Sequence, residues 1–209
     1  GWRFQSVNAR TAESVMTVDG TLTRSPVTSP WAFDLRVTGQ PVSLPEIARL
    51  VPALSGVTLQ PSFTVKAEGP LDSLKLGMNV QSSAGQLSGT VTANVAAATD
   101  AKSGRPMFAR GEVSVKHLDL SPILKNPRQK SDITANARFD LHSQSLSNID
   151  TLHGTAAIDS PRMVAAGYVA EKIHAKARVD GRRVALDGSA SAYGAAATVA
   201  GNVTLPEGK

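Results

Sequence analysis

The four histidines are the side chains of this chain best suited to holding a metal ion or moving a proton. They are His117, His142, His153 and His174. No two of them have the H-x-H or H-E-x-x-H spacing of a metal site. The chain has 0 cysteines to complete such a site. We therefore expect the histidines to lie on a polar face or at strand ends, with no metal and no cofactor bound.

Nucleophile and phosphate-loop motifs are absent from the sequence as well. It has no G-x-S-x-G element of the kind that presents a catalytic serine. The Gly-rich segment Gly85–Gly89 lacks the lysine and following helix of a phosphate-binding loop, so we interpret it as a turn or bulge. Asp34, Asp140, Asp159 and Asp180 fall on polar faces or at turns. The sequence thus predicts no catalytic residues and a protein that is not an enzyme.

Basic residues gather in two short segments. Lys125, Arg128 and Lys130 share a polar linker, and Arg182–Arg183 stands at a predicted hairpin. Nucleic-acid binding would need aromatic side chains interleaved with these cations, and there are none. We interpret both segments as solvated rims and predict no nucleic-acid partner. Contact with lipid phosphates at the edge of a groove is a further alternative.

Length and composition bound the class of protein. The chain has 209 residues, a formal net charge of +5, 41% hydrophobic residues and 19% charged residues. This is too apolar for a disordered chain, and the length suffices for a substantial core. No stretch approaches the ~20 apolar residues of a membrane-spanning helix. The pattern begins abruptly at Gly1, so we expect a fragment of a longer chain.

Alternation of apolar and polar residues dominates the sequence and predicts strands with one dry and one wet face. Runs of this kind are Trp31–Val37, Val57–Ala67, Leu74–Val80, Val91–Val95, Ile133–Leu141, Ile173–Val179 and Val184–Ala192. Asp180–Gly181 predicts a type I′ hairpin turn, and Ser160–Pro161 predicts another reversal.

Helical patterns are scarce. Leu44–Leu54 places Ile47, Leu50, Val51 and Leu54 on one face, and Leu120–Leu124 is a one-turn counterpart. We expect both to be short plugs over the end of a sheet. The order of helix, linker and strands occurs twice. It suggests weak repeat units at about residues 41–110 and 111–209 within a single segment, residues 1–209.

The dry faces are rich in Ala, Gly and Val, and only 4% of all residues are aromatic. A sheet with an apolar face must bury it against a second sheet, by closing into a barrel, or against an apolar ligand. Small side chains would make a thin sandwich core but would leave room for acyl chains in a trough. The sequence alone favours neither alternative over the other.

Three segments together resemble a known family. They are Gly111–Leu124, then Gly69–Leu76 followed by Ala84–Gly89, and Val179–Leu186 followed by Ala192–Ala195. Their order and number resemble the AsmA-like proteins, the TamB (translocation and assembly module) family in particular. The resemblance covers most of residues 40–205.

The resemblance implies an all-β fold, an elongated, curved antiparallel sheet that forms an open β-groove (a β-taco) with one or two short helices. A closed β-sandwich is the alternative. It also implies a non-enzymatic segment of a periplasm-spanning protein, anchored in the inner membrane, whose groove shields phospholipid acyl chains on the way to the outer membrane. In such proteins the full-length chain partners an outer-membrane barrel protein and the inner membrane. The implied location is the periplasm of a Gram-negative-type bacterium.

The expected lining of the groove consists of the dry-face residues. They are Val57, Leu59, Phe63, Val65, Leu74, Leu76, Met78, Val80, Val91, Val95, Val113, Val115, Ile133, Phe139, Leu141, Ile173, Val179, Val184 and Leu186. A closed protein core would use the same residues. The alternative function is therefore a structural or adhesive β-repeat, and a polar-ligand β-sandwich is weakened by the scarcity of aromatic residues.

Overall fold

The fold is known from a computed structural model, which describes residues 1–24, 31–48, 57, 59–96, 106–144 and 148–205. Twelve strands account for most of these residues, and the helical elements are single turns. The strands are β1 (Trp2–Arg10), β2 (Val15–Thr23), β3 (Ala32–Gly39), β4 (Ser62–Pro70), β5 (Leu74–Ser82), β6 (Gly85–Ala93), β7 (Met107–Leu118), β8 (Ser131–Ser143), β9 (His153–Ala165), β10 (Tyr168–Asp180), β11 (Arg183–Ala192) and β12 (Ala195–Thr204). The helices are α1 (Leu44–Ile47) and α3 (Ser121–Leu124), and the 3₁₀ turns are η2 (Leu71–Ser73), η3 (Pro127–Gln129) and η4 (Ile149–Thr151).

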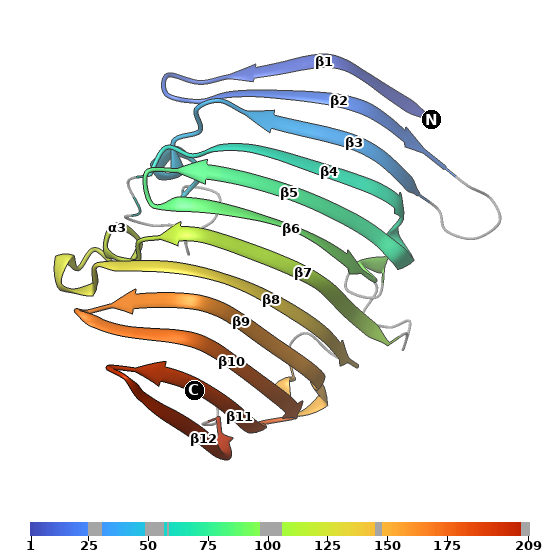
Figure 1. The fold of residues 1–209 in the computed structure, drawn as a ribbon. Helices are drawn as coiled ribbons and strands as arrows, with labels where there is room; N and C mark the ends of the chain where they lie inside the picture. The colour runs from blue at the N-terminus through green and yellow to red at the C-terminus, as the bar shows by residue number, and fades with distance from the viewer. Residues whose placement is uncertain (25–30, 49–56, 58, 97–105, 145–147, 206–209) are drawn as a thin grey trace.

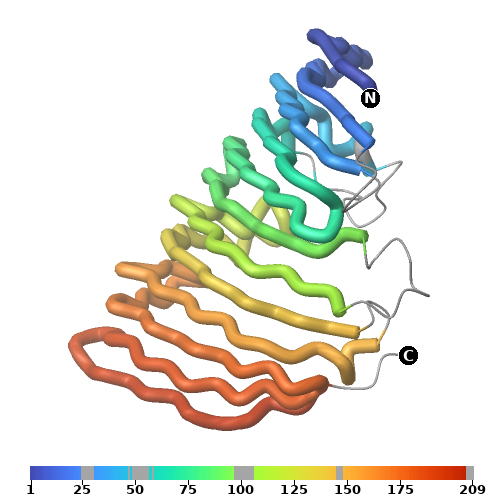
Figure 2. Tube along the Cα trace, turned by 90° about the vertical axis from the view of Figure 1, so that its right-hand side faces the viewer, coloured from blue at the N-terminus to red at the C-terminus, as the bar shows by residue number. Residues whose placement is uncertain are grey.

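All twelve strands belong to one antiparallel sheet, in which each strand pairs with its neighbours in sequence from β1 to β12. Figure 1 shows the strands as stacked arches, and Figure 2 shows the same stack from the side. With strands ~4.8 Å apart, the stack is about 50 Å long. The fold is thus the predicted open, curved β-groove, and the described strands form no second sheet that would make a closed sandwich.

The predicted alternation forms these strands because successive side chains of a strand point to opposite faces. In β8, Ala137, Phe139 and Leu141 are half-buried, whereas Arg138 and Asp140 between them are exposed. Antiparallel register then places like beside like, since Phe139 pairs with Ala156 and Arg138 with Ala157. The sheet therefore has an apolar face and a polar face along its whole length.

Bulges interrupt the ladder in the middle of β1 and near the end of β7. Ser6 and His117 lie at register shifts and have φ angles of 49° and 52°. Their backbone N–H groups instead donate to neighbouring side chains, Ser6 to the Asp19 carboxylate at 2.7 Å and His117 to the Thr134 hydroxyl at 3.2 Å. Bulges of this kind bend a strand and increase its twist.

Two turn predictions are wrong in position or kind. Ser160–Pro161 lies inside β9 at a register shift against β8, so it marks a bulge and not a reversal. Proline has no N–H for a ladder and fits such a shift. The hairpin between β10 and β11 has Gly181 and Arg182 as its central residues, one residue beyond the predicted pair. Only Gly181 has a positive φ, 58°, as a type II′ turn requires.

A small core closes one end of the arches. Val57, Leu59 and Ala84 are buried there, with Leu44 of α1 and Ile123 of α3 packed against them. Both helices are therefore plugs over the end of the sheet, as predicted, and Figure 1 places α3 at that end. The strand predicted from Val57 begins only at Ser62, because the chain first crosses this plug.

Other predicted elements end earlier than their patterns suggest. The helix predicted over Leu44–Leu54 is formed at Leu44–Ile47, and residues 49–56 lie outside the described residues. Residues 145–147 also lie outside the described residues, and Ile149 begins the 3₁₀ turn η4. No helix in the described ranges is long and apolar enough to cross a membrane.

Candidate functional site

The apolar face is continuous across the sheet. One cross-strand row of paired residues passes through every strand, and a second row beside it does the same. The first row is Phe4, Gly20, Leu35, Ala67, Leu76, Val91, Gly111, Phe139, Ala156, Ala177, Leu186 and Gly201. The second row is Val7, Val18, Val37, Val65, Met78, Gly89, Val113, Ala137, Ile158, Ala175, Gly188 and Val199. Neither row contains a charged or hydrogen-bonding side chain.

No described element covers these rows, and some of their members are well exposed. Ile158 is 40% exposed, Leu186 37% and Val199 62%. Exposed apolar surface that is contiguous over many residues commonly marks a binding surface. The apolar face is therefore the first candidate site of the molecule.

A small hollow of about 190 Å³ lies on this face near the C-terminal hairpin. Its walls are Ile173, Ala190 and Ala197 on one side and Ala175 and Val199 on the other. All five are apolar and come from β10, β11 and β12. His174, Gly188, Ser189 and Thr198 complete the lining, and the hollow can hold a few methylene groups.

The structure distributes the predicted lining residues between two environments. Phe63, Val65, Leu74, Leu76, Met78, Val80, Val91, Val113, Val115, Ile133, Phe139, Leu141, Ile173, Val179, Val184 and Leu186 lie in strands, in phase with the two rows. Val57 and Leu59 lie in the end plug, and Val95 follows the end of β6. These three therefore do not belong to the strand rows, because the alternation continues in sequence beyond the point where the strand ends.

The sequence places many small residues on the dry faces, but the expected lining does not name the ones that occupy the two rows. Ala156, Ala177, Gly89 and Gly111 occupy row positions that bulky residues fill elsewhere. A Cβ atom on Gly111 would stand 2.3 Å from the carbonyl oxygen of Thr90, so the backbones approach closely there. Their in-phase position within alternating runs was the available signal.

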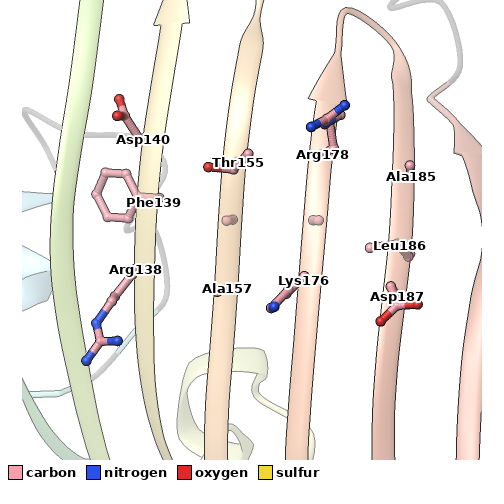
Figure 3. A pocket seen from close by; sticks show the side chains of 12 residues that line it. Arg138, Phe139, Asp140, Thr155, Ala157, Lys176, Arg178, Ala185, Leu186 and Asp187 are labelled. Carbon is pink, nitrogen blue, oxygen red and sulfur yellow. The ribbon is translucent and has the colours of Figure 1, made fainter.

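A larger hollow of about 650 Å³ lies over β8–β11. Its lining consists of the row segment Phe139, Ala156, Ala177 and Leu186 and of the polar-face residues on either side of it, which are Arg138, Asp140, Thr155, Ala157, Lys176, Arg178, Ala185 and Asp187. Figure 3 shows the charged side chains standing in front of the strands. The hollow therefore opens on the polar face, with the backbone of the apolar row as its floor.

Each of the four histidines contacts an aspartate through a ring nitrogen. Nitrogen–oxygen distances are 3.0 Å for His117–Asp132, 2.9 Å for His142–Asp140, 2.9 Å for His153–Asp180 and 2.6 Å for His174–Asp159. All four histidine side chains are more than half exposed, and they lie on the polar face. The described residues contain no group of three or more side chains placed to bind a metal ion.

Two carboxylates have lowered pKa values. The pKa of Glu68 is lowered mainly by its 2.6 Å hydrogen bond from the Lys66 ammonium, helped by the charge of Lys75. The pKa of Asp119 is lowered by backbone N–H groups of Ser121 and Ser131, which donate at 2.9 and 3.1 Å. Asp119 thereby ties α3 to the start of β8, and its role is structural.

The basic residues singled out in the sequence lie at opposite ends of the strands. Lys125, Arg128 and Lys130 are exposed around α3 and η3 at the plugged end. Arg182 lies at the other end, where its Nε donates to the Asp150 carboxylate at 2.7 Å. No family model, curated protein or solved structure matches the chain.

Proposed function

We propose that this chain is a non-enzymatic segment of a lipid conduit, in which the apolar face shelters acyl chains while they cross an aqueous compartment. The single observation that supports it is the pair of uninterrupted apolar rows, uncovered by any described element. The location we propose is the periplasm, with the parent chain anchored in the inner membrane and partnered by an outer-membrane barrel protein. The resemblance to AsmA-like and TamB proteins is the basis for both.

The energetics of such a surface favour movement over storage. Burying one methylene contributes about 0.8 kcal/mol, so a sixteen-carbon chain in water is unfavourable by roughly 12 kcal/mol. A continuous apolar surface removes much of this cost at every position along the sheet. Because neighbouring positions are similar, no single one holds the chain strongly, and the acyl chain can slide along the rows.

Side-specific photocrosslinking tests the proposal. A photoreactive amino acid is placed at Phe63, Val80 or Phe139 on the apolar face, and at Asn79 or Asn136 on the polar face as matched controls. The protein is irradiated in cells and bound lipids are identified by mass spectrometry. We expect phospholipid adducts from the three apolar positions and none from the controls.

Two outcomes would overturn the proposal. One is the absence of adducts at all apolar positions, which would leave the structural or adhesive β-repeat as the better explanation. The other is equal labelling from both faces, which would indicate lipid sticking without a groove. The neighbouring pair Val80 and Asn79 makes this comparison over a single residue step.

A further inference from the structure

The 650 Å³ hollow on the polar face runs along β9, between β8 and β10, whose polar-face side chains are longer. We call this hollow the valley. Thr155 and Ala157 of β9 carry short side chains, whereas Arg138 of β8 and Lys176 of β10 pair with Ala157 from either side. Arg178 pairs with Thr155 one row further along. With strands ~4.8 Å apart, the backbones of Arg138 and Lys176 are separated by roughly 10 Å across the valley.

The side chains that line the valley are apolar along their stems and charged at their ends. The long stems of arginine and lysine present methylene groups along their length and hold their charge at the end. Figure 3 shows Arg138, Lys176 and Arg178 around Thr155 and Ala157. A volume of about 650 Å³ falls within the range of small-molecule sites.

The nearby acidic residues leave these cations incompletely neutralised. Asp140, Asp159 and Asp180, the aspartates on β8, β9 and β10 around the valley, each pair with a histidine. Among the described residues, Lys176 and Arg178 make no ion pair within 4.0 Å.

Two further carboxylates face the site more loosely. Arg138 contacts Glu112 at 3.4 Å, with both side chains more than half exposed. Asp187 stands opposite Lys176 in the register of β10 and β11, without an ion pair. The lining thus holds three cations, Arg138, Lys176 and Arg178, against two carboxylates, Asp140 and Asp187, a net formal charge of +1. The two cations nearest to Ala157 are Arg138 and Lys176, which pair with it from either side.

We infer that this valley binds a small organic anion with an apolar body. The anionic group, a carboxylate or phosphate, lies above Ala157 between the Arg138 guanidinium and the Lys176 ammonium, with Arg178 as a third donor. Arginine suits such a group because its planar fork donates two parallel hydrogen bonds. The body of the ligand lies along Thr155 and the stems of the cations. The site lies on the face opposite the two apolar rows, so it is independent of the proposed lipid function.

Titration followed by amide NMR tests this inference on the whole chain, with 2-naphthoate as the probe. We expect saturable shifts at Thr155 and Ala157. Lys176→Gln should weaken binding about tenfold, as expected for the loss of one charge-assisted hydrogen bond. Ala157→Leu should abolish binding by filling the valley. Arg36→Gln, a polar-face cation on β3 far along the sheet, is the matched control and should leave the affinity unchanged.

The outcomes separate the possible errors. Absence of saturable shifts, or equal loss in the Arg36 control, would overturn the site. Inorganic phosphate that binds as well as 2-naphthoate would overturn the role of the apolar body. Shifts that survive Ala157→Leu and centre on Ala175 and Val199 would assign the probe to the apolar face instead. That result would leave the lipid proposal standing, just as absence of lipid crosslinks would leave this site standing.

Discussion

The middle of the sheet and its C-terminal hairpins are built from the same alternation but differ in how they use it. In β4 and β5 the apolar face carries Phe63, Leu74 and Met78, and Leu74 is only 7% exposed. In β11 and β12 the corresponding positions include Gly188 and Val199, and Val199 is 62% exposed. Val199 lies on the edge strand β12, which has a neighbour on one side only, whereas β4 and β5 lie in the interior of the sheet. Apolar alternation thus specifies a strand in both regions, and the position of the strand in the sheet decides how much of its apolar face stays accessible.

The largest effect is expected where the two regions share one row. This is a third apolar row beside the first, and it consists of Leu74, Ala93, Ala109, Leu141, Gly154, Val179, Val184 and Val203. Leu74 and Val203 lie at its two ends, on β5 and β12. Leu74→Ala should lower the free energy of unfolding by about 2–4 kcal/mol, because a buried side chain is lost and a cavity is left. Val203→Ala, at 46% exposure on an edge strand, should cost less than about 1 kcal/mol. Urea unfolding measures both, and equal losses would contradict the comparison.

A second test concerns close backbone approach in the middle of the sheet. Gly111→Ala would bring a Cβ atom to 2.3 Å from the Thr90 oxygen, so the strands must separate. We expect a loss of about 1–3 kcal/mol, in the range of overpacked sites. Gly77→Ala, on β5 with no atom within 4 Å of the new Cβ, is the control and should stay within about 0.5 kcal/mol of the parent. A stable Gly111 variant would show that the approach is not required.

In the C-terminal hairpins, we expect a substitution on the apolar face to change the amount of bound lipid and to leave the free energy of unfolding nearly unchanged. Ala175→Leu fills the 190 Å³ hollow on the apolar face between β10 and β12. If the proposed lipid function is right, acyl chains recovered per protein should fall by about half or more, while the free energy of unfolding changes by less than about 1 kcal/mol. Asn202→Leu, on the polar face of β12 and outside the lining of this hollow, is the matched control and should leave lipid recovery unchanged. A loss in both variants would point to general misfolding.

The smallest effect concerns the plugged end of the middle region. The lowered pKa of Asp119 reflects hydrogen bonds that the ionised carboxylate accepts in the folded state. Its stabilisation is therefore present above the unfolded-state pKa near 4 and is lost as the pH falls through the lower folded value. Asp119→Asn should lower the melting temperature slightly at pH 7 and have less effect near pH 2.5. Thermal melts across this range measure it, and a difference that grows on acidification would contradict the assigned cause.

Much of the sheet follows from the sequence because strand periodicity is local. Runs such as Ile133–Leu141 place their own residues on two faces regardless of what pairs with them. Strand β1 escaped detection because the bulge at Ser6 changes its phase, so that Phe4 and Val7 fall in adjacent rows on the same face. Val57 and Leu59 alternate in phase with β4 yet belong to the plug, since burial by a helix and burial by a sheet leave the same pattern.

The polar-face valley could not be predicted from the sequence for a different reason. Arg138, Ala157 and Lys176 lie on three different strands and meet only through their register. A bulge elsewhere in β9 changes that register, and bulges are set by tertiary pairing as well as by residue type.

The strictly sequential strand order has a consequence for how such a protein folds and changes in length. Every strand pairs only with its neighbours along the chain, so assembly can proceed by adding one hairpin at a time, without long-range loop closure. Insertion or deletion of one hairpin would change the span by about 10 Å and leave the cross-section as it was. A molecule of this design can therefore be lengthened or shortened in steps of a single unit.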